Sequence, residues 1–240
     1  MSLPIIVAPT YDIKLVSLPH PVTYRPYLVK EEKLLLTAQQ SEDPKDIERA
    51  IKQIARNCTD GAVDVDALPL FDLEYLFLQL RAKSVNNIVT LRYGCRNPTS
   101  NGVCGAPVTI EVNLDEVKID VPEGHTNRVM LTETVGVTLK YPCVNHLDAF
   151  NSELGNVDVV QVLIDCLDTV FGTDGTVSEI RETDPAEVRA FVESLSIPQV
   201  ENLKVFFETM PRLSHTMTFA CPKCAYTEDI VLTGLLDFFG

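Results

Sequence analysis

The chain has 240 residues, of which 45% are hydrophobic and 22% charged, with a formal net charge of −14. This composition is typical of a globular protein with a sizeable core, and it excludes wholesale disorder. The acid is concentrated between Asn145 and Leu203, where 12 Asp or Glu residues stand against only Arg181 and Arg189. Such a surface repels phosphate backbones, so we expect no nucleic-acid partner. It either complements a basic protein surface or only keeps the chain in solution.

Neither a membrane span nor a secretory signal is expected. No apolar run reaches the roughly 18 to 20 residues that a spanning helix needs. The apolar run from Leu3 to Ala8 is broken by Pro4 and has no basic leader. Seven cysteines without such a signal favour a reducing compartment, where thiols serve as metal ligands or core side chains.

The first 87 residues predict short strands followed by helices. Apolar and polar residues alternate from Tyr11 to Leu15, and Pro26 ends the extended segment. Asp43 can cap a helix in which Cys58 continues the apolar stripe, so we expect a buried thiol there. The three expected helices begin at Val29, Asp43 and Leu70.

The pattern then alternates between strands and helices. Two strands, 88–93 and 108–112, flank a loop rich in Asn, Pro, Gly and Ser. One or two strands are expected within 126–142, and a capping box is expected at Asp184. Three helices follow at 159–170, 184–195 and 198–207, and the first would bury Cys166. Strands at 216–220 and 230–232 precede an apolar tail from Leu235 to Phe239.

Four cysteines stand in the turns between these strands. Cys221 and Cys224 form a C-x-x-C, which presents two thiolates to one point when it lies between two strands. Cys95 and Cys104 flank the other loop and are the natural second pair. Together they predict one structural zinc ion that joins two hairpins distant in sequence. Four thiolates leave no position for water, so the site would not be catalytic.

Alternatives remain for these cysteines. A redox C-x-x-C is one, although such motifs begin a helix. Four unrelated buried thiols are another. If Cys95 or Cys104 is not a ligand, Cys143, His146 or His215 could replace it. No nucleophile, phosphate-loop or dinucleotide motif is present, so we expect no enzyme.

Two segments carry a family resemblance. The string from Tyr24 to Lys33 (YRPYLVKEEK) and the ending Cys221-x-x-Cys224 followed by GLLDFF resemble the baseplate hub assembly proteins of T4-like contractile-tailed phages. The resemblance covers nearly the whole chain. It implies a non-enzymatic hub component or assembly factor that contacts other baseplate hub or tail proteins. It would act in the host bacterial cytoplasm during assembly, or in the virion tail baseplate.

We therefore expect an α+β fold with a helical body and a split zinc-ribbon-like module. The expected parts are residues 1–87 (strands and helices), 88–112 with 213–240 (zinc module and apolar tail), and 113–212 (an inserted strand and acidic helical region). The alternative function is a cytosolic zinc-ribbon adaptor for a protein partner. The N-terminal segment from Leu3 to Pro9 and the tail are candidate partner surfaces, unless they dock on the protein's own core.

Overall fold

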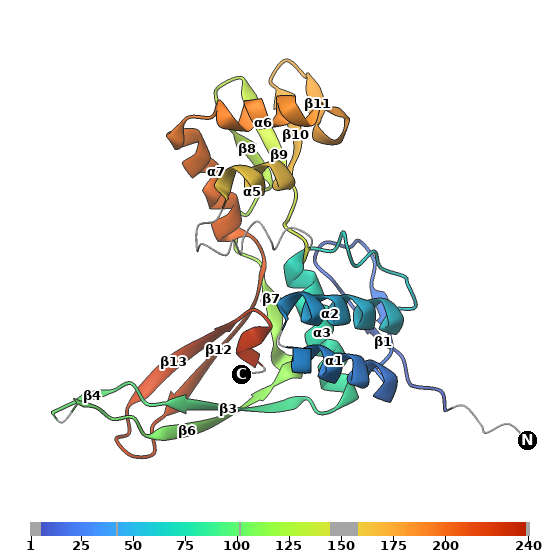
Figure 1. Cartoon of the computed structure of the whole chain (residues 1–240). Helices are drawn as coiled ribbons and strands as arrows, with labels where there is room; N and C mark the ends of the chain where they lie inside the picture. The colour runs from blue at the N-terminus through green and yellow to red at the C-terminus, as the bar shows by residue number, and fades with distance from the viewer. Residues whose placement is uncertain (1–5, 42, 101, 145–157, 239–240) are drawn as a thin grey trace, which may run out of the picture. The chain divides into compact units, whose positions relative to one another are not determined.

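The computed structural model describes residues 6–41, 43–100, 102–144 and 158–238. They fall into two compact units. The terminal unit comprises Met1–Asp120 and Arg212–Gly240, and the inserted unit comprises Val121–Pro211. Within the described residues the chain forms six α-helices and several small antiparallel sheets, so the expected mixture of α and β structure is confirmed (Figure 1). None of the described helices is long and apolar enough to cross a membrane.

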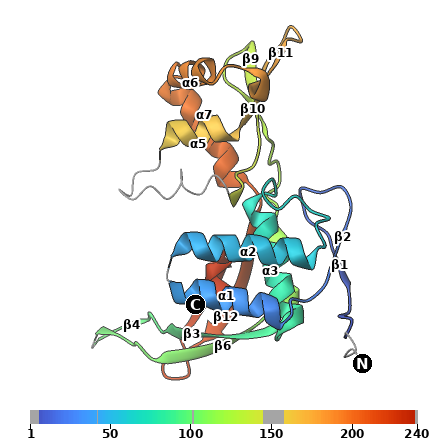
Figure 2. The ribbon, with the colours of Figure 1, turned by 45° about the vertical axis from the view of Figure 1, so that its right-hand side comes forward.

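Three helices form the body of the terminal unit: α1 (Val29–Ser41), α2 (Pro44–Cys58) and α3 (Leu70–Ser84). The expected cap of α2 is present, because the Asp43 side chain accepts a hydrogen bond from the Lys45 N–H at 2.9 Å. Helices α1 and α2 lie side by side (Figure 2). The predicted start of each helix is confirmed to within a residue.

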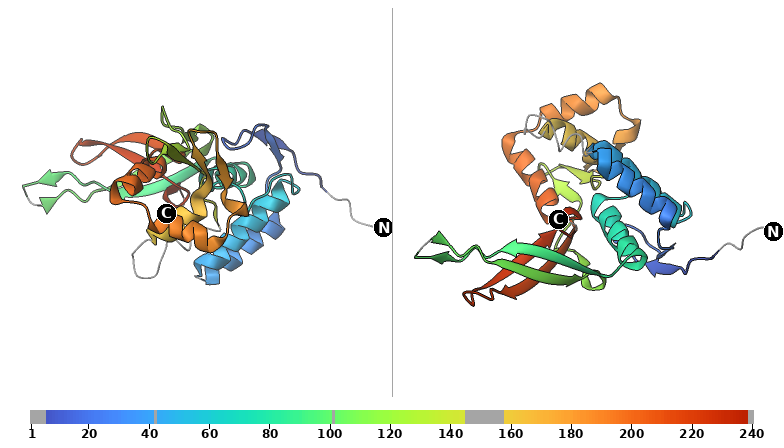
Figure 3. Two further views of the ribbon diagram at one scale, coloured as in Figure 1. Left: turned by 90° about the horizontal axis from the view of Figure 1, so that it is seen from above. Right: turned by 60° about the horizontal axis from the view of Figure 1, so that its bottom comes forward.

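Short strands complete this unit. Two long hairpins, β3–β6 and β12–β13, are both antiparallel and extend away from the helices (Figure 3). Strand β7 pairs with the other edge of β12. The strands are β1 (Tyr11–Ile13), β2 (Val22–Tyr24), β3 (Ile88–Gly94), β4 (Pro98–Thr99), β5 (Gly102–Val103), β6 (Pro107–Asn113), β7 (Lys118–Asp120), β12 (Arg212–Ala220) and β13 (Thr227–Thr233). Single 3₁₀ turns lie at η1 (Leu114–Glu116) and η4 (Leu236–Phe238).

One core joins helix α3 to both hairpins. It takes apolar side chains from α3, from each hairpin and from the tail, and all are at most 8% exposed. Its members are Leu78, Ala82, Leu91, Val112, Leu114, Val117, Leu213, Leu232 and Phe238. Since Leu78 and Ala82 are four residues apart, they face the sheets from one side of α3. The proximal parts of the two hairpins are thereby held together by ordinary apolar packing.

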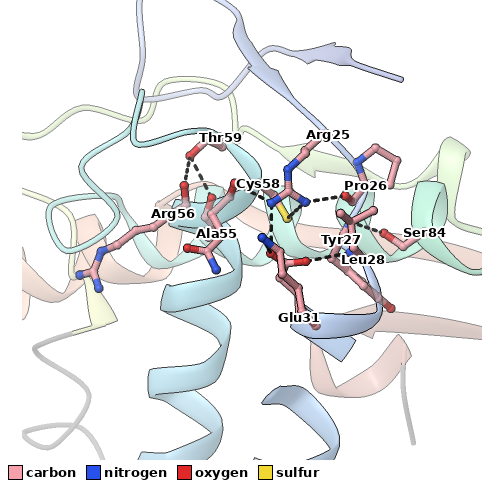
Figure 4. A network of polar contacts seen from close by, with 12 residues as sticks. Arg25, Pro26, Tyr27, Leu28, Glu31, Ala55, Arg56, Cys58, Thr59 and Ser84 are labelled. Carbon is pink, nitrogen blue, oxygen red and sulfur yellow. Dashed lines mark hydrogen bonds and ion pairs between the residues drawn. The ribbon is translucent and has the colours of Figure 1, made fainter. Parts of the chain in front are cut away.

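The string from Tyr24 to Lys33 forms a buried polar clasp (Figure 4). Arg25 donates to Glu31 Oε1 at 3.0 Å and to the carbonyl oxygen of Asn57 at 3.1 Å. Glu31 is fully buried, and its Oε2 accepts from the Leu28 N–H at 2.9 Å. Burial favours a higher pKa for Glu31, but the bonds from Arg25 and Leu28 outweigh it and lower the pKa below its usual value. The clasp fixes the start of α1 against the end of α2, so this string has a structural role.

The inserted unit packs three helices with a four-stranded antiparallel sheet of order β11-β10-β9-β8. Its buried core combines strand residues such as Val137 and Leu139 with Leu203 and Phe206 of α7. The elements are β8 (Arg128–Met130), β9 (Val135–Leu139), α5 (Val159–Cys166), β10 (Leu167–Gly172), β11 (Val177–Glu179), the 3₁₀ turn η3 (Ile180–Glu182), α6 (Pro185–Glu193) and α7 (Ile197–Thr209).

One helix prediction in this unit is wrong in part. The helix expected over 159–170 ends at Cys166, and residues 167–172 form β10. This strand lies in the interior of the sheet, paired with β9 on one side and β11 on the other. Backbone pairing on both edges overrides a helical spacing that came from only a few apolar residues. The complete capping box lies at Ser196 and Gln199, whereas Asp184 only accepts a bond from the Ala186 N–H.

Candidate metal centre

The four cysteines singled out in the sequence meet at one point. Their Sγ atoms all lie within 4.8 Å of one another, and the Sγ atoms of Cys95 and Cys224 are 3.7 Å apart. The last paired residues of the two hairpins are Gly94 with Pro107 and Ala220 with Thr227. Each cysteine pair therefore sits in the turn just beyond its hairpin. A cluster of this kind can hold a metal ion.

The two cysteine turns, here called knuckles, have the same backbone pattern. In the second knuckle the Cys221 N–H donates to the carbonyl of Tyr226 and the Ala225 N–H donates to the carbonyl of Cys221, at 2.8 and 2.9 Å. In the first knuckle, Cys95 N–H donates to Ala106 and Gly105 N–H donates to Cys95, at 2.9 and 3.0 Å.

The residue after the second cysteine has a positive φ in both knuckles: 61° at Gly105 and 56° at Ala225. This left-handed residue turns the chain back toward its partner strand, which leaves both sulfurs on the same side. The C-x₈-C and C-x-x-C spacings thus produce equivalent turns.

The centre has an apolar surround. Cys95 and Cys221 are 1% and 2% exposed, whereas Cys104 and Cys224 are partly exposed. Phe219 and other apolar side chains from the two hairpins complete the cluster around them. Low local polarity strengthens the interaction of a cation with thiolates.

A polar side chain that none of the sequence motifs indicated also contacts the cluster. The Asn97 Nδ2 donates to Cys224 Sγ at 3.5 Å. This bond, with the Tyr226 N–H, lowers the pKa of Cys224 to about 6. The Asn97 N–H acts to lower the pKa of Cys95, but burial and the bonds to the other three thiols raise it to about 12.

The lowered pKa of Cys224 favours its thiolate, which is the form of cysteine that binds a metal ion. A bound divalent cation would let all four ionise. An Asn two residues after a cysteine in a polar turn is a sequence signal for this contact.

One sulfur–sulfur distance fits tetrahedral coordination. Sulfurs bound to zinc at about 2.3 Å in a tetrahedron lie about 3.8 Å apart, close to the observed 3.7 Å between Cys95 and Cys224. Four ligands would close the coordination shell. A redox C-x-x-C starts a helix, but here Cys221 and Cys224 lie between two antiparallel strands.

The possible substitute ligands lie elsewhere. Among the described residues, neither Cys143 nor His215 belongs to the cluster, and His146 lies outside the described residues. Cys58 and Cys166 are buried in the helical parts of the two units, as expected for core thiols. Burial raises the pKa of Cys58 to about 11 and that of Cys166 to about 12, which keeps both protonated.

The two candidate partner surfaces behave differently. In the tail, Phe238 is 1% exposed within the core of the terminal unit, and the Leu235 N–H donates to Glu74 Oε1 at 3.1 Å. The described part of the tail is thus docked on this protein. In the N-terminal segment, Ile6 and Val7 are 91% and 88% exposed.

Comparison with known proteins identifies the family. The family model described as "T4 bacteriophage base plate protein" matches residues 8–240. The chain belongs to this family. The chain is also similar to the "Baseplate hub assembly protein gp26" of Enterobacteria phage T4, to which it is 21% identical over 223 residues. The match covers 91% of this chain and 92% of the relative. No solved structure matches the chain.

Proposed function

We propose that this base plate protein is a component or assembly factor of the baseplate hub and acts through protein–protein contacts. The observation that carries the proposal is the match to a hub assembly protein over nearly the full length of both chains. Its partners would be other hub or tail proteins, in the host bacterial cytoplasm during assembly or in the virion tail. Family membership favours this role over that of a cytosolic zinc-ribbon adaptor.

We also propose that Cys95, Cys104, Cys221 and Cys224 bind one structural zinc ion in a split zinc-ribbon-like module. The mutual distances of the thiols and the matching knuckles support this assignment. The ion would link the distal ends of two hairpins whose proximal ends already share the core with α3. A closed four-thiolate shell contributes to folding and leaves no site for a reacting water, so the protein would not be an enzyme through this centre.

Metal content tests the zinc site. Native mass spectrometry of the purified chain should show one zinc per chain, lost with chelator. Cys221→Ser should abolish it, whereas Cys58→Ala, which removes a thiol outside the cluster, should keep it. Zinc retained by Cys221→Ser, or a zinc-free wild-type chain with undiminished thermal stability, would refute the assignment.

Deleting the gene tests the hub role. Host cells infected with the deleted phage should accumulate incomplete baseplates in electron micrographs, and a plasmid copy should restore plaques. Normal plaque numbers without any copy would exclude the proposed role.

A further inference from the structure

A groove in the terminal unit lies away from the cysteine cluster. It has a volume of ≈ 630 Å³ and is bounded by α1, α2, α3 and the start of the tail. Its apolar lining includes Leu35 and Leu36 of α1, Ile51 of α2 and Phe77 of α3. Side chains from all three helices thus line one largely apolar groove.

The mouth of the groove carries exposed apolar side chains. Leu36 is 53% exposed and Val85, just after α3, is 55% exposed, and both line the groove. Ile47 and Ile51, whose spacing predicts core positions, are only partly buried there. Exposed apolar surface that is continuous with a groove marks an interaction site more often than a scattered single residue does.

Within the described residues, one nitrogen of a charged side chain in the groove has no hydrogen-bond acceptor. Arg81 of α3 lines the groove, and its Nη1 is buried with no hydrogen-bond acceptor among the described residues. Within the same part of the chain no ion pair joins Arg81 to a carboxylate. An unpaired buried guanidinium N–H is costly, because it has lost water without gaining an acceptor.

The position of Arg81 in its helix does not account for this burial. A positive charge in the last turn of α3 is favourable next to the helix C-terminus. That interaction does not require a buried nitrogen. The neighbouring Lys83 places a positive charge at the same helix end from a partly exposed position, where it pairs with Asp115 at 2.7 Å. Arg81 instead places a positive charge with an unsatisfied donor among the apolar side chains that line the groove.

We propose that this groove binds an apolar segment of a baseplate partner protein that carries one Asp or Glu, whose carboxylate pairs with Arg81. The inference rests on the proposed function and specifies the chemistry of the partner. Guanidinium and carboxylate groups form the strong charge-assisted pairs of protein interfaces, and the apolar lining accepts the flanking side chains. Glu32 at the rim and the net charge of −14 disfavour a highly anionic ligand.

Photo-crosslinking identifies the occupant. A benzoylphenylalanine is placed at Leu36, or at Val231 on β13 as a control of similar exposure (54%). The chain is then produced together with the baseplate proteins of the same genome. From Leu36, we expect a crosslink to an apolar peptide of one such protein with an Asp or Glu. A crosslink only to a second copy of this chain, or none from Leu36, overturns the inference.

Arg81→Met then tests the pairing. The crosslinked peptide, made synthetically, should bind Arg81→Met roughly 10- to 100-fold more weakly than wild type. A peptide in which Asn or Gln replaces the Asp or Glu should bind the wild-type chain as weakly as the original peptide binds Arg81→Met. Its affinity should not fall further when it is tested against Arg81→Met. Lys83→Met removes a charge from the same helix end and should leave binding unchanged. Because the variant loses an unsatisfied donor, it should melt at or above the wild-type temperature.

Equal binding of the carboxylate and amide peptides overturns the inference. This result leaves the hub role intact if the deleted phage still fails to assemble baseplates. A deleted phage that assembles normally excludes the hub role and the inference with it.

Discussion

The buried clasp of Arg25 and Glu31 gives the sharpest stability prediction. In Arg25→Met, Glu31 keeps the Leu28 N–H and the exposed Lys30, whose Nζ is 3.4 Å from Oε1, but loses its buried cation. The carbonyl of Asn57 loses a donor as well. Breaking a buried pair costs about 3–5 kcal/mol. Since Lys30 remains, we expect the lower end of this range, about 3 kcal/mol, for the terminal unit.

The cost should depend on pH in a defined direction. The pKa of Glu31 is lowered in the fold, so its contribution is present above its unfolded pKa and disappears as pH falls through the lower folded value. Without Arg25, less opposes the effect of burial, so we expect the pKa of Glu31 to rise and acid to neutralise the stranded carboxylate more readily. The difference between wild type and Arg25→Met should therefore shrink as pH falls below about 5.

Pulse-labelling hydrogen exchange over a urea series measures this effect locally. Peptides from α1 and α2 report on the terminal unit at neutral pH and near pH 4. Arg49→Met serves as the control, since Arg49 is 71% exposed and pairs with Asp46 on the surface. We expect it to cost less than about 1 kcal/mol. If Arg25→Met also costs less than that at neutral pH, with no pH dependence, the clasp does not stabilise the fold as argued.

Three further substitutions test interactions within each of the two units. In Gly136→Ala the new Cβ would lie 2.7 Å from Cε2 of Phe171. We therefore expect thermal unfolding to show a stability lower by about 1–3 kcal/mol. Gly94→Ala is the control, because Gly94 has open space around it and the substitution should leave stability unchanged. Phe238→Ala should cost about 3–5 kcal/mol in urea unfolding, because this tail residue is fully buried; an unchanged midpoint would show that the tail does not support the core. Burial lowers the pKa of His125, so the inserted unit should lose stability as pH falls from about 6.5. Melting curves at pH 7 and pH 5 measure this loss, and His125→Gln should remove it.

Much of the local structure could be predicted from short patterns. Helix α2 follows from a cap at Asp43, a first-turn proline and an apolar stripe, because these signals depend only on neighbouring residues. The meeting of the four thiols was predictable for a similar reason. Cysteines placed in polar turns between strands have few roles, and two such pairs suggest one site.

Other features depend on tertiary contacts that no local pattern contains. Residues 167–170 continue a helical spacing, yet they form a strand because β9 and β11 both pair with it. The apolar pattern of the tail was equally consistent with a partner surface and with a place in the core. Phe238 lies in the core, where it packs with side chains of α3 and both hairpins. Arg81 carried no signal in the sequence, since an arginine near a helix end is ordinary.

The knuckles show which part of a cysteine spacing matters. Cys221 and Cys224 are separated by two residues and Cys95 and Cys104 by eight, yet both pairs close the same two backbone hydrogen bonds. The six additional residues in the first knuckle contain the β4–β5 pair, and the Cys104 N–H returns to the carbonyl of Asn97 at 2.9 Å. A small hairpin is thus inserted into the turn without moving its ends. The placement of the sulfurs depends on the strands that flank a knuckle and on the left-handed residue after its second cysteine, not on the number of residues between the two.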